Sequence, residues 1–282
     1  MKLMNINSSN FLKILPTKLN NPNSILKSVF NGEIIIFEKS IFINEIIKII
    51  KSHFKKIYSL SLEDFLDNKD DLTFDKKEKL FSKLQKNIKE CSVINDNFIF
   101  FLEELGFRTE YVFKDQYSLR YSPKIYGKSF GKLKPAPPHR DTWASNLFNQ
   151  INFWFPIHNI SATNSIYIVP KYFKEKVENN SMEWSFESFK KRNDYPSAPY
   201  AKINIHDDEK QYFQIDKGNI ICFSGHHLHG SLQNKKNRIN LETRIIYNSK
   251  ANDIIEPKNN DSESKIIKKN WFRNILTNKV LD

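Results

Sequence analysis

The spacing of apolar residues changes near Tyr111 from a helical period to a strand period, and this change limits the class of fold. Before it, apolar residues recur at three- and four-residue spacing, as on one face of a helix; they are Ile46, Ile47, Ile50 and Phe54. After it, stretches such as residues 150–155 alternate between two sets of side chains, as strands do when their faces meet different surroundings. We therefore expect an α+β protein whose second half is mainly β.

Short apolar runs between turn residues continue the strand pattern. The expected strands are residues 34–37, 117–121, 150–155, 164–169, 200–205, 212–215, 218–223 and 241–247. Many short strands with turn signals between them are typical of a barrel or jelly roll. Besides the helix that begins after Ser40, helices are expected over 76–89, 95–105 and 265–281, with a loop or short helix at 61–71 and a loop at 251–264.

Length and composition suit one globular domain with a substantial core. The chain has 282 residues, of which 39% are hydrophobic and 27% charged, an ordinary balance for a globular protein. We expect a single domain with a mostly helical part over 1–107, a β core over 108–250, and a loop and helix over 251–282.

The sequence predicts a cytoplasmic protein. No stretch approaches the ~20 consecutive apolar residues that span a membrane, and residues 1–10 lack the continuous apolar segment of a secretory signal. Cys91 and Cys222 are the two cysteines, too few and too far apart for a disulfide framework or a cysteine metal site.

The net charge of +12 raises the question of nucleic-acid binding. Lysines are spread along the whole chain, and no arginine-rich arm or helix-turn-helix signature concentrates the charge. A solvated basic surface is therefore the favoured interpretation, and a nucleic-acid partner is unlikely. An acidic or phosphorylated small molecule is compatible with the same charge.

A His-x-Asp pair at residues 139–141 is the first candidate for a metal site. Alternate side chains of a strand point to the same face, so His139 and Asp141 would lie together while Arg140 points away. A histidine from a later strand would complete a two-histidine, one-carboxylate facial triad, which holds non-haem ferrous iron with open positions. The pattern therefore predicts an iron-dependent oxygenase.

The third ligand is expected in the segment Phe223–Ser231, which contains three histidines. Strand alternation puts His227 and His229 on one face, so periodicity leaves both open. His226 is expected to be a surface or packing residue.

Several ordered segments are similar to the phytanoyl-CoA dioxygenase superfamily of iron(II)- and 2-oxoglutarate-dependent oxygenases. They are Phe30–Ile34, His139–Trp143, Gln150–Pro156, Asn164–Pro170, Lys217–Phe223 and His229–Ser231, followed by Arg238. The resemblance implies a double-stranded β-helix (jelly-roll, cupin-like) core with the metal in its mouth. It also implies that His229 is the third ligand, because the family's distal histidine stands immediately before a small pair such as Gly230-Ser231.

The resemblance implies roles for polar residues near the metal. An arginine on the strand after the distal ligand is expected to bind the far carboxylate of 2-oxoglutarate, which its rigid fork suits. Arg238 is the best match and Arg244 the alternative, although a surface ion pair explains Arg244 equally well. Ser231 would hydrogen-bond the same carboxylate.

Strand 150–155 is expected to run along the cavity. There Asn152 and Gln150 would contact the cosubstrate or support the metal ligands, and Trp154 would face the substrate. Trp143 would form a wall over iron or substrate, although an ordinary core position explains it equally well. His227 would line the pocket.

The expected reaction is hydroxylation of a small-molecule metabolite by O2 and 2-oxoglutarate, with release of succinate and CO2. Asp141 argues against halogenation, because loss of that carboxylate is what would open a coordination site for chloride. Residues 171–200 are expected to cover the pocket, and their cations and aromatic side chains suit an acidic or phosphorylated molecule. Two alternatives remain: a cupin-like metal-dependent isomerase or epimerase, which needs no anchoring arginine, and a basic nucleic-acid-binding module.

Overall fold

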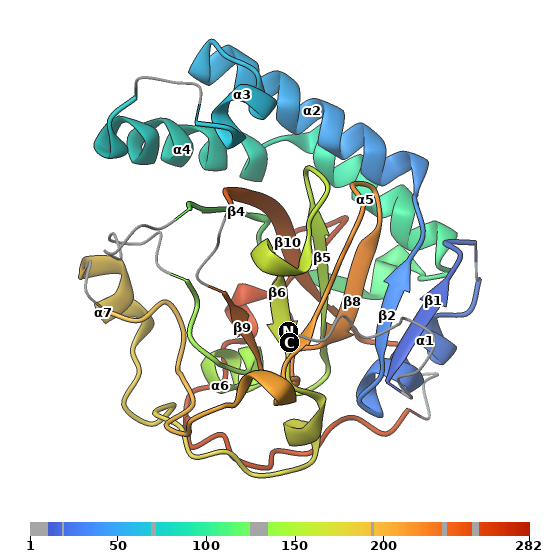
Figure 1. The fold of residues 1–282 in the computed structure, drawn as a ribbon. Helices are drawn as coiled ribbons and strands as arrows, with labels where there is room; N and C mark the ends of the chain where they lie inside the picture. The colour runs from blue at the N-terminus through green and yellow to red at the C-terminus, as the bar shows by residue number, and fades with distance from the viewer. Residues whose placement is uncertain are drawn as a thin grey trace.

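The computed structural model describes residues 11–18, 20–68, 72–124, 135–192, 195–232, 236–249 and 254–282. In these ranges it combines two β-sheets with seven α-helices (Figure 1). Residues 1–10, where no secretory signal is expected, lie outside the described ranges, as does the start of the loop predicted at 251–264.

Five helices cover one face of the larger sheet (Figure 1). They are α1 (Pro22–Phe30), α2 (Ile41–Tyr58), α3 (Leu62–Leu66), α4 (Phe74–Lys89) and α5 (Ser92–Glu104). α2 begins where the Ser40 hydroxyl accepts a hydrogen bond from the N–H of Phe42, which satisfies an amide that has no partner inside the helix. α5 presents Phe98 and Phe101 to Phe153 of the sheet, with ring centroids 5.7 and 5.8 Å apart. The main apolar core therefore lies between the helices and the sheet.

The larger sheet has eight strands in the described ranges, and its central strands carry candidate site residues. In spatial order they are β1 (Leu12–Leu15), β2 (Ile34–Phe37), β8 (Ile220–Ser224), β5 (Gln150–Pro156), β10 (Arg238–Tyr247), β3 (Val112–Lys114) and β11 (Arg273–Asn274), with β4 (Ser118–Ser122) also paired to β10. β5 and β10 are antiparallel, with Asn152 opposite Arg244. All of β5 is buried; its odd-numbered apolar residues join the helix-side core, whereas Asn152 and Trp154 face the other side, as the alternation predicts.

A smaller sheet packs against that other side. It consists of β7 (Gln211–Tyr212), β6 (Ile166–Ile168) and β9 (His229–Ser231). His139 extends it through an isolated bridge to His229, in which the two backbone N–H···O=C bonds measure 2.8 and 2.9 Å. Buried side chains of β2, β5, β6 and β8 fill the space between the sheets. Two facing sheets are consistent with the expected jelly-roll core.

Two elements predicted from the sequence are absent from the described residues. The helix predicted over 265–281 is wrong, because this segment forms a 3-10 turn at Lys269–Trp271 and then β11. β11 pairs with β3, and Phe272 is buried beside Ile246, so the apolar residues make contacts at the sheet edge instead of forming one helix face. The strand predicted at 200–205 is reduced to one bridge between Ala201 and Asn179.

Two short helices stand between strands of the β region: α6 (Asp141–Ser145) and α7 (Phe186–Lys191). No helix in the described ranges is both long and apolar enough to cross a membrane.

Candidate metal centre

The side chains of His139, Asp141 and His229 come together, and their ligand atoms all lie within 4.8 Å of one another. The Asp141 carboxylate lies 3.9 Å from Nε2 of His139 and 3.7 Å from Nε2 of His229. Among the described residues, no other group of three His, Cys, Asp or Glu side chains is arranged in this way. The donor set is thus two imidazole nitrogens and one carboxylate.

Backbone pairing places the two histidines, and a helix start places the carboxylate. His139 and His229 face each other across the bridge that extends the smaller sheet. Arg140 is still extended, with φ −110° and ψ 137°, but Asp141 is the first residue of α6. The sequence-based expectation that Asp141 belongs to the strand is therefore wrong by one residue. The turn into the helix nevertheless directs its carboxylate toward both imidazoles.

Hydrogen bonds fix which nitrogen of each imidazole is free. Nδ1 of His139 lies 2.7 Å from the carbonyl oxygen of Pro137, and Nδ1 of His229 lies 3.0 Å from that of His227. A carbonyl oxygen only accepts, so each Nδ1 carries the proton and donates it. The lone pairs of both Nε2 atoms are left to face Asp141, as in metal-binding histidines held by an outer partner.

Charge and burial hold Asp141 and His139 in the protonation states that a metal requires. Burial alone would raise the pKa of Asp141, but Arg244, the two histidines and a 2.5 Å hydrogen bond from Asn152 lower it to about 2. Burial, together with the neighbouring His229, lowers the pKa of His139 to about 3. Near neutral pH the carboxylate is therefore charged and the His139 imidazole is neutral.

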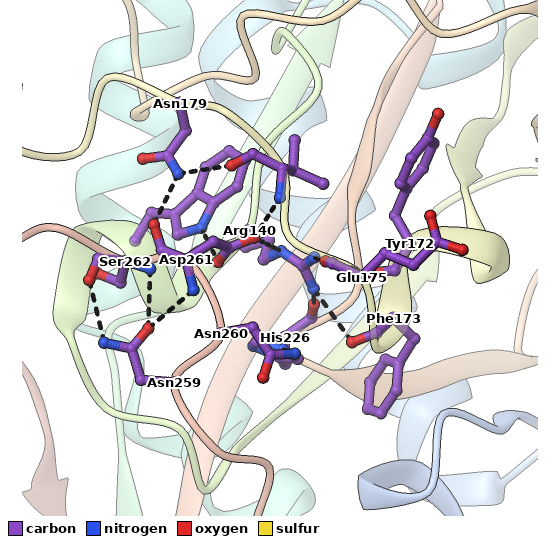
Figure 2. Close-up of polar contacts among 12 residues, drawn as sticks. Arg140, Tyr172, Phe173, Glu175, Asn179, His226, Asn259, Asn260, Asp261 and Ser262 are labelled. Atoms are coloured by element: carbon purple, nitrogen blue, oxygen red, sulfur yellow. Dashed lines mark hydrogen bonds and ion pairs between the residues drawn. The ribbon is translucent and has the colours of Figure 1, made fainter.

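Arg140, which stands between two ligands in the sequence, is the centre of a buried polar cluster (Figure 2). Its side chain is 0% exposed, and its Nε lies 3.1 Å from the Asp261 carboxylate in an ion pair. Its Nη atoms donate hydrogen bonds to the main-chain carbonyls of Tyr172, Phe173, Glu175 and His226. A buried guanidinium is thereby compensated by a charge and four acceptors.

Asp261 also contacts Trp143, which lies on the opposite side of Asp141 in the sequence from Arg140. It accepts hydrogen bonds from Nε1 of Trp143, at 2.7 Å, and from the N–H of Val177, at 3.1 Å. Arg140 and Trp143 lie on either side of Asp141 in the sequence. The segment that carries Asp261 therefore holds the start of α6 in place from both sides (Figure 2).

The triad lines a cavity of about 530 Å³, and Arg238 lines the same cavity. Arg238 is 1% exposed, and burial lowers its pKa to about 10. Its Nη atoms donate to the Ser122 hydroxyl at 3.0 Å, the Ser231 hydroxyl at 3.1 Å and the Asn164 carbonyl at 3.2 Å, while its Nε has no hydrogen-bond partner among the described residues. No carboxylate of the described residues forms an ion pair with it. A buried cation without a counter-charge is a receptor for an anion.

Arg244 also lines the cavity but is already paired. Its guanidinium forms an ion pair with Asp115 and lies 3.4 Å from the Asp141 carboxylate. Burial would lower its pKa, but these two carboxylates together raise it. Of the two arginines considered from the sequence, Arg238 is therefore the one with charge available to a ligand.

Some of the residues that the sequence singles out on β5 and β9 line the cavity, and one does not. Asn152, Trp154 and Ser231 line the cavity. The Asn152 Oδ1 and the Trp154 Nε1 are buried there and have no hydrogen-bond partner in the described part of the chain, as expected of groups that await a ligand. Gln150 does not line the cavity; its Nε2 donates to the Ser145 hydroxyl at 3.0 Å, so it braces the end of α6.

Trp143 and His227 do not line the cavity, which corrects two sequence-based expectations. Trp143 packs in a separate apolar cluster, because α6 turns its ring toward Asp261. Both ring nitrogens of His227 lie near main-chain carbonyls, those of Ser224 and Gly32 at 3.2 and 3.1 Å. The β8–β9 turn separates it from the strand face that carries His229.

Three residues with roles at the site were not singled out from the sequence. Asp115 pairs with Arg244, Asp261 pairs with Arg140, and Trp271 lines the cavity. Each lies in a segment without a local sequence motif, and each reaches the site only through the tertiary fold.

No protein-family model matches the chain, and none of the curated proteins matches it. Solved structures do. EctD from S. alaskensis with bound Fe has a TM-score of 0.39 and 14% identity over 82% of this chain and 78% of that one. EvdO2 from Micromonospora carbonacea var. aurantiaca, complexed with 2-oxoglutarate, has a TM-score of 0.37 and 10% identity over 58% and 63%. The epimerase SnoN, in complex with Fe3+, alpha ketoglutarate and nogalamycin RO, has a TM-score of 0.35 and 12% identity over 60% of each chain.

The chain spans less than two thirds of the EvdO2 and SnoN chains that it matches. At these TM-scores the likeness carries no argument about function, which therefore has to come from the residues of the site.

Proposed function

We propose that the protein is an Fe(II)- and 2-oxoglutarate-dependent dioxygenase, similar to the phytanoyl-CoA dioxygenase superfamily and built on a double-stranded β-helix core. One observation carries the proposal: the His139–Asp141–His229 triad and the unpaired guanidinium of Arg238 line the same cavity. Three protein ligands leave positions for a bidentate cosubstrate and O2. The buried cation supplies the counter-charge for a carboxylate that does not reach the metal.

The donor atoms fit ferrous iron. His139 and His229 would bind it through Nε2, and Asp141 through its carboxylate. When bound, iron together with 2-oxoglutarate and O2 supplies the oxidising power for an unactivated C–H bond, and the cosubstrate leaves as succinate and CO2. Asn152 and Arg244 hold the Asp141 carboxylate in place through hydrogen bonds, so the ligand geometry exists before the metal arrives.

Arg238 and Ser231 would bind the far carboxylate of the cosubstrate. The Ser231 oxygen accepts a hydrogen bond from Arg238, so its own proton remains available to a second acceptor. The free Nε–H of Arg238 adds another donor. Burial of this cation from water makes a new ion pair stronger than it would be at the surface.

The proposed substrate is a small molecule that is hydroxylated in the same cavity. A metal-dependent isomerase or epimerase that does not use 2-oxoglutarate is the competing function, and it has no need of a second, anion-binding centre beside the metal. The unpaired Arg238 therefore favours the dioxygenase.

An anaerobic titration tests the proposal: apo-protein receives Fe(II) and then 2-oxoglutarate, while the visible metal-to-ligand charge-transfer band is recorded. We expect the band in the unchanged protein and its loss in His139→Ala. Arg238→Met should keep iron binding but weaken 2-oxoglutarate binding about tenfold or more, because it removes one partner of a buried charge pair. Arg108→Met is the control, since Arg108 is exposed and lies outside the cavity.

The outcomes separate the candidate functions. Iron binding without a charge-transfer band would favour the isomerase. Failure to bind iron would rule out the dioxygenase, and failure to bind any divalent metal would rule out both metal-dependent functions. Equal 2-oxoglutarate affinity in Arg238→Met and Arg108→Met would show that another residue binds the far carboxylate.

A further inference from the structure

The cavity has an aromatic side that the metal site does not use. α7 contains no buried residue, although two of its six residues are phenylalanines. Phe186 of α7 and Trp184 just before it are half-buried and line the cavity, as does Trp271 from the 3-10 turn near the C-terminus. We call Trp184, Phe186 and Trp271 the aromatic wall. Apolar side chains that are not packed in a core and that line a cavity are surface for a ligand to cover.

Phe186 is in ring contact with both other members of the aromatic wall. The Phe186 ring centroid lies 5.1 Å from that of Trp271 and 6.3 Å from that of Trp184. The ring planes are inclined at 58° and 43°, so the rings do not stack on one another.

Arg244 connects the aromatic wall to the metal ligands. Its guanidinium carbon lies 5.6 Å from the Trp271 ring centroid, and its Nη1 lies 3.4 Å from the Asp141 carboxylate. The aromatic wall is thus only one side chain away from Asp141. Arg238 lies six residues earlier on the same strand, about 20 Å away along β10. The cavity therefore has an anion-binding part near Arg238 and an aromatic part near Arg244.

The cations around α7 do not serve the cavity. The ammonium of Lys190 lies 4.6 Å from the Phe186 ring centroid and pairs with Glu187, and neither Lys190 nor Lys191 lines the cavity. Arg244 is occupied by two carboxylates. Lys89, which does line the cavity, is exposed to solvent. The described residues therefore offer no buried, unpaired cation for a phosphate in the aromatic part.

We propose that the aromatic wall binds the substrate through a flat ring system. The substrate class is then a small molecule with an aromatic or similarly flat, mainly apolar ring, and not the acidic or phosphorylated molecule that the composition of this segment suggests. The inference rests on the proposed function, which supplies the reacting centre at the triad.

The chemistry of the aromatic wall distinguishes a ring from a chain. Ring–ring contacts add a favourable interaction to the burial of apolar area, and a flexible acyl chain gains no such interaction. A chain also loses rotational freedom when it is immobilised, whereas a fused ring has none to lose. The aromatic wall itself contains no aliphatic side chain.

Calorimetric titration of the anaerobic protein, loaded with Fe(II) and saturated with 2-oxoglutarate, tests this inference with two monocarboxylates. The probes are 2-naphthoate, a flat ring, and octanoate, a chain with the same charge. Saturating 2-oxoglutarate keeps both probes away from Arg238. We expect 2-naphthoate to bind about tenfold more tightly than octanoate.

Phe186→Ala should weaken 2-naphthoate about fivefold or more, and Phe186→Trp should restore its affinity. Because α7 has no buried residue, neither change is expected to unfold the protein. Lys191→Ala is the control, since it lies on the same helix but outside the cavity.

The charge-transfer band of each sample keeps this inference separate from the proposed function. If the band forms but octanoate binds as tightly as 2-naphthoate, or Phe186→Ala leaves the 2-naphthoate affinity unchanged, the ring inference fails alone. If no band forms but 2-naphthoate still binds in a Phe186-dependent way, the proposed function fails, whereas the ring-binding site stands.

Discussion

At the scale of single residues, Asp261 compensates the most deeply buried charge near the triad. Arg140 is 0% exposed, and the Asp261 carboxylate is its one charged partner among the described residues. Four carbonyl oxygens share the guanidinium, but a neutral acceptor does not cancel a full charge in a medium of low dielectric constant.

Asp261→Ala should therefore lower the free energy of unfolding of the metal-free protein by about 3–5 kcal/mol, since it leaves a buried cation uncompensated. Urea unfolding measures the change. The control is Glu45→Gln, which breaks the exposed Lys48–Glu45 pair and should change stability by no more than about 0.5 kcal/mol. If the two variants lose the same stability, Arg140 does not depend on Asp261.

Some site residues could be predicted from the sequence because their signal is local. His139 and Asp141 stand two positions apart, so a short pattern is enough to group them. The partners of Trp143 and Arg244 are different, because Asp261 lies 118 positions from the first and Asp115 lies 129 positions from the second. No periodicity reaches over such distances, and only the folded chain reveals these pairs.

At the scale of elements, the three residues of β9 each have a separate task. His229 belongs to the triad, and Ser231 accepts a hydrogen bond from Arg238. Gly230 between them lets Tyr167 pack against the strand. A Cβ at Gly230 would lie 2.5 Å from the Tyr167 hydroxyl oxygen and 3.2 Å from the Ala136 carbonyl oxygen. Any larger residue would push β9 away from its neighbours.

Gly230→Ala should lower the free energy of unfolding by about 1–3 kcal/mol through overpacking. Because β9 carries His229, the same change should weaken Fe(II) binding, as measured by anaerobic titration. Adding Tyr167→Phe, which removes the clashing oxygen, should recover part of both losses. If the double variant is no better than Gly230→Ala alone, the clash is not with the Tyr167 hydroxyl.

Element type followed from the sequence where one periodicity dominated. The alternation of β5 and the stripes of α2 and α4 are properties of the residues themselves, and the structure confirms these elements. The region from Lys265 to Leu281 is different, since its spacing of apolar residues fits a helix but the chain uses them against the edge strand β3. Tertiary packing outweighed local preference there.

At the scale of the whole molecule, buried histidines link stability to pH. Burial lowers the pKa of His226 to about 3 and that of His227 to about 4, compared with about 6.5 in an unfolded chain. The unfolded chain therefore takes up these protons first as the pH falls. Their contribution to stability is complete above about pH 6.5 and is lost progressively as the pH falls toward the folded-state values.

The free energy of unfolding of the metal-free protein should fall by up to about 1.4 kcal/mol per pH unit for each such histidine, between about pH 6.5 and about pH 4. Urea unfolding in the presence of a chelator measures this slope. His226→Gln should reduce the pH dependence of the free energy of unfolding by the contribution of one histidine. An unchanged slope in that variant would contradict the assignment to His226.

The wide sequence separation of the site residues also orders events during synthesis. The ribosome releases His139 and Asp141 well before His229, and Asp261 emerges later still. A growing chain thus exposes two of the three candidate ligands before it possesses the third one, Arg238 or the partner that neutralises Arg140. If the triad binds a metal as proposed, tight binding therefore requires the chain to have been synthesised at least as far as His229.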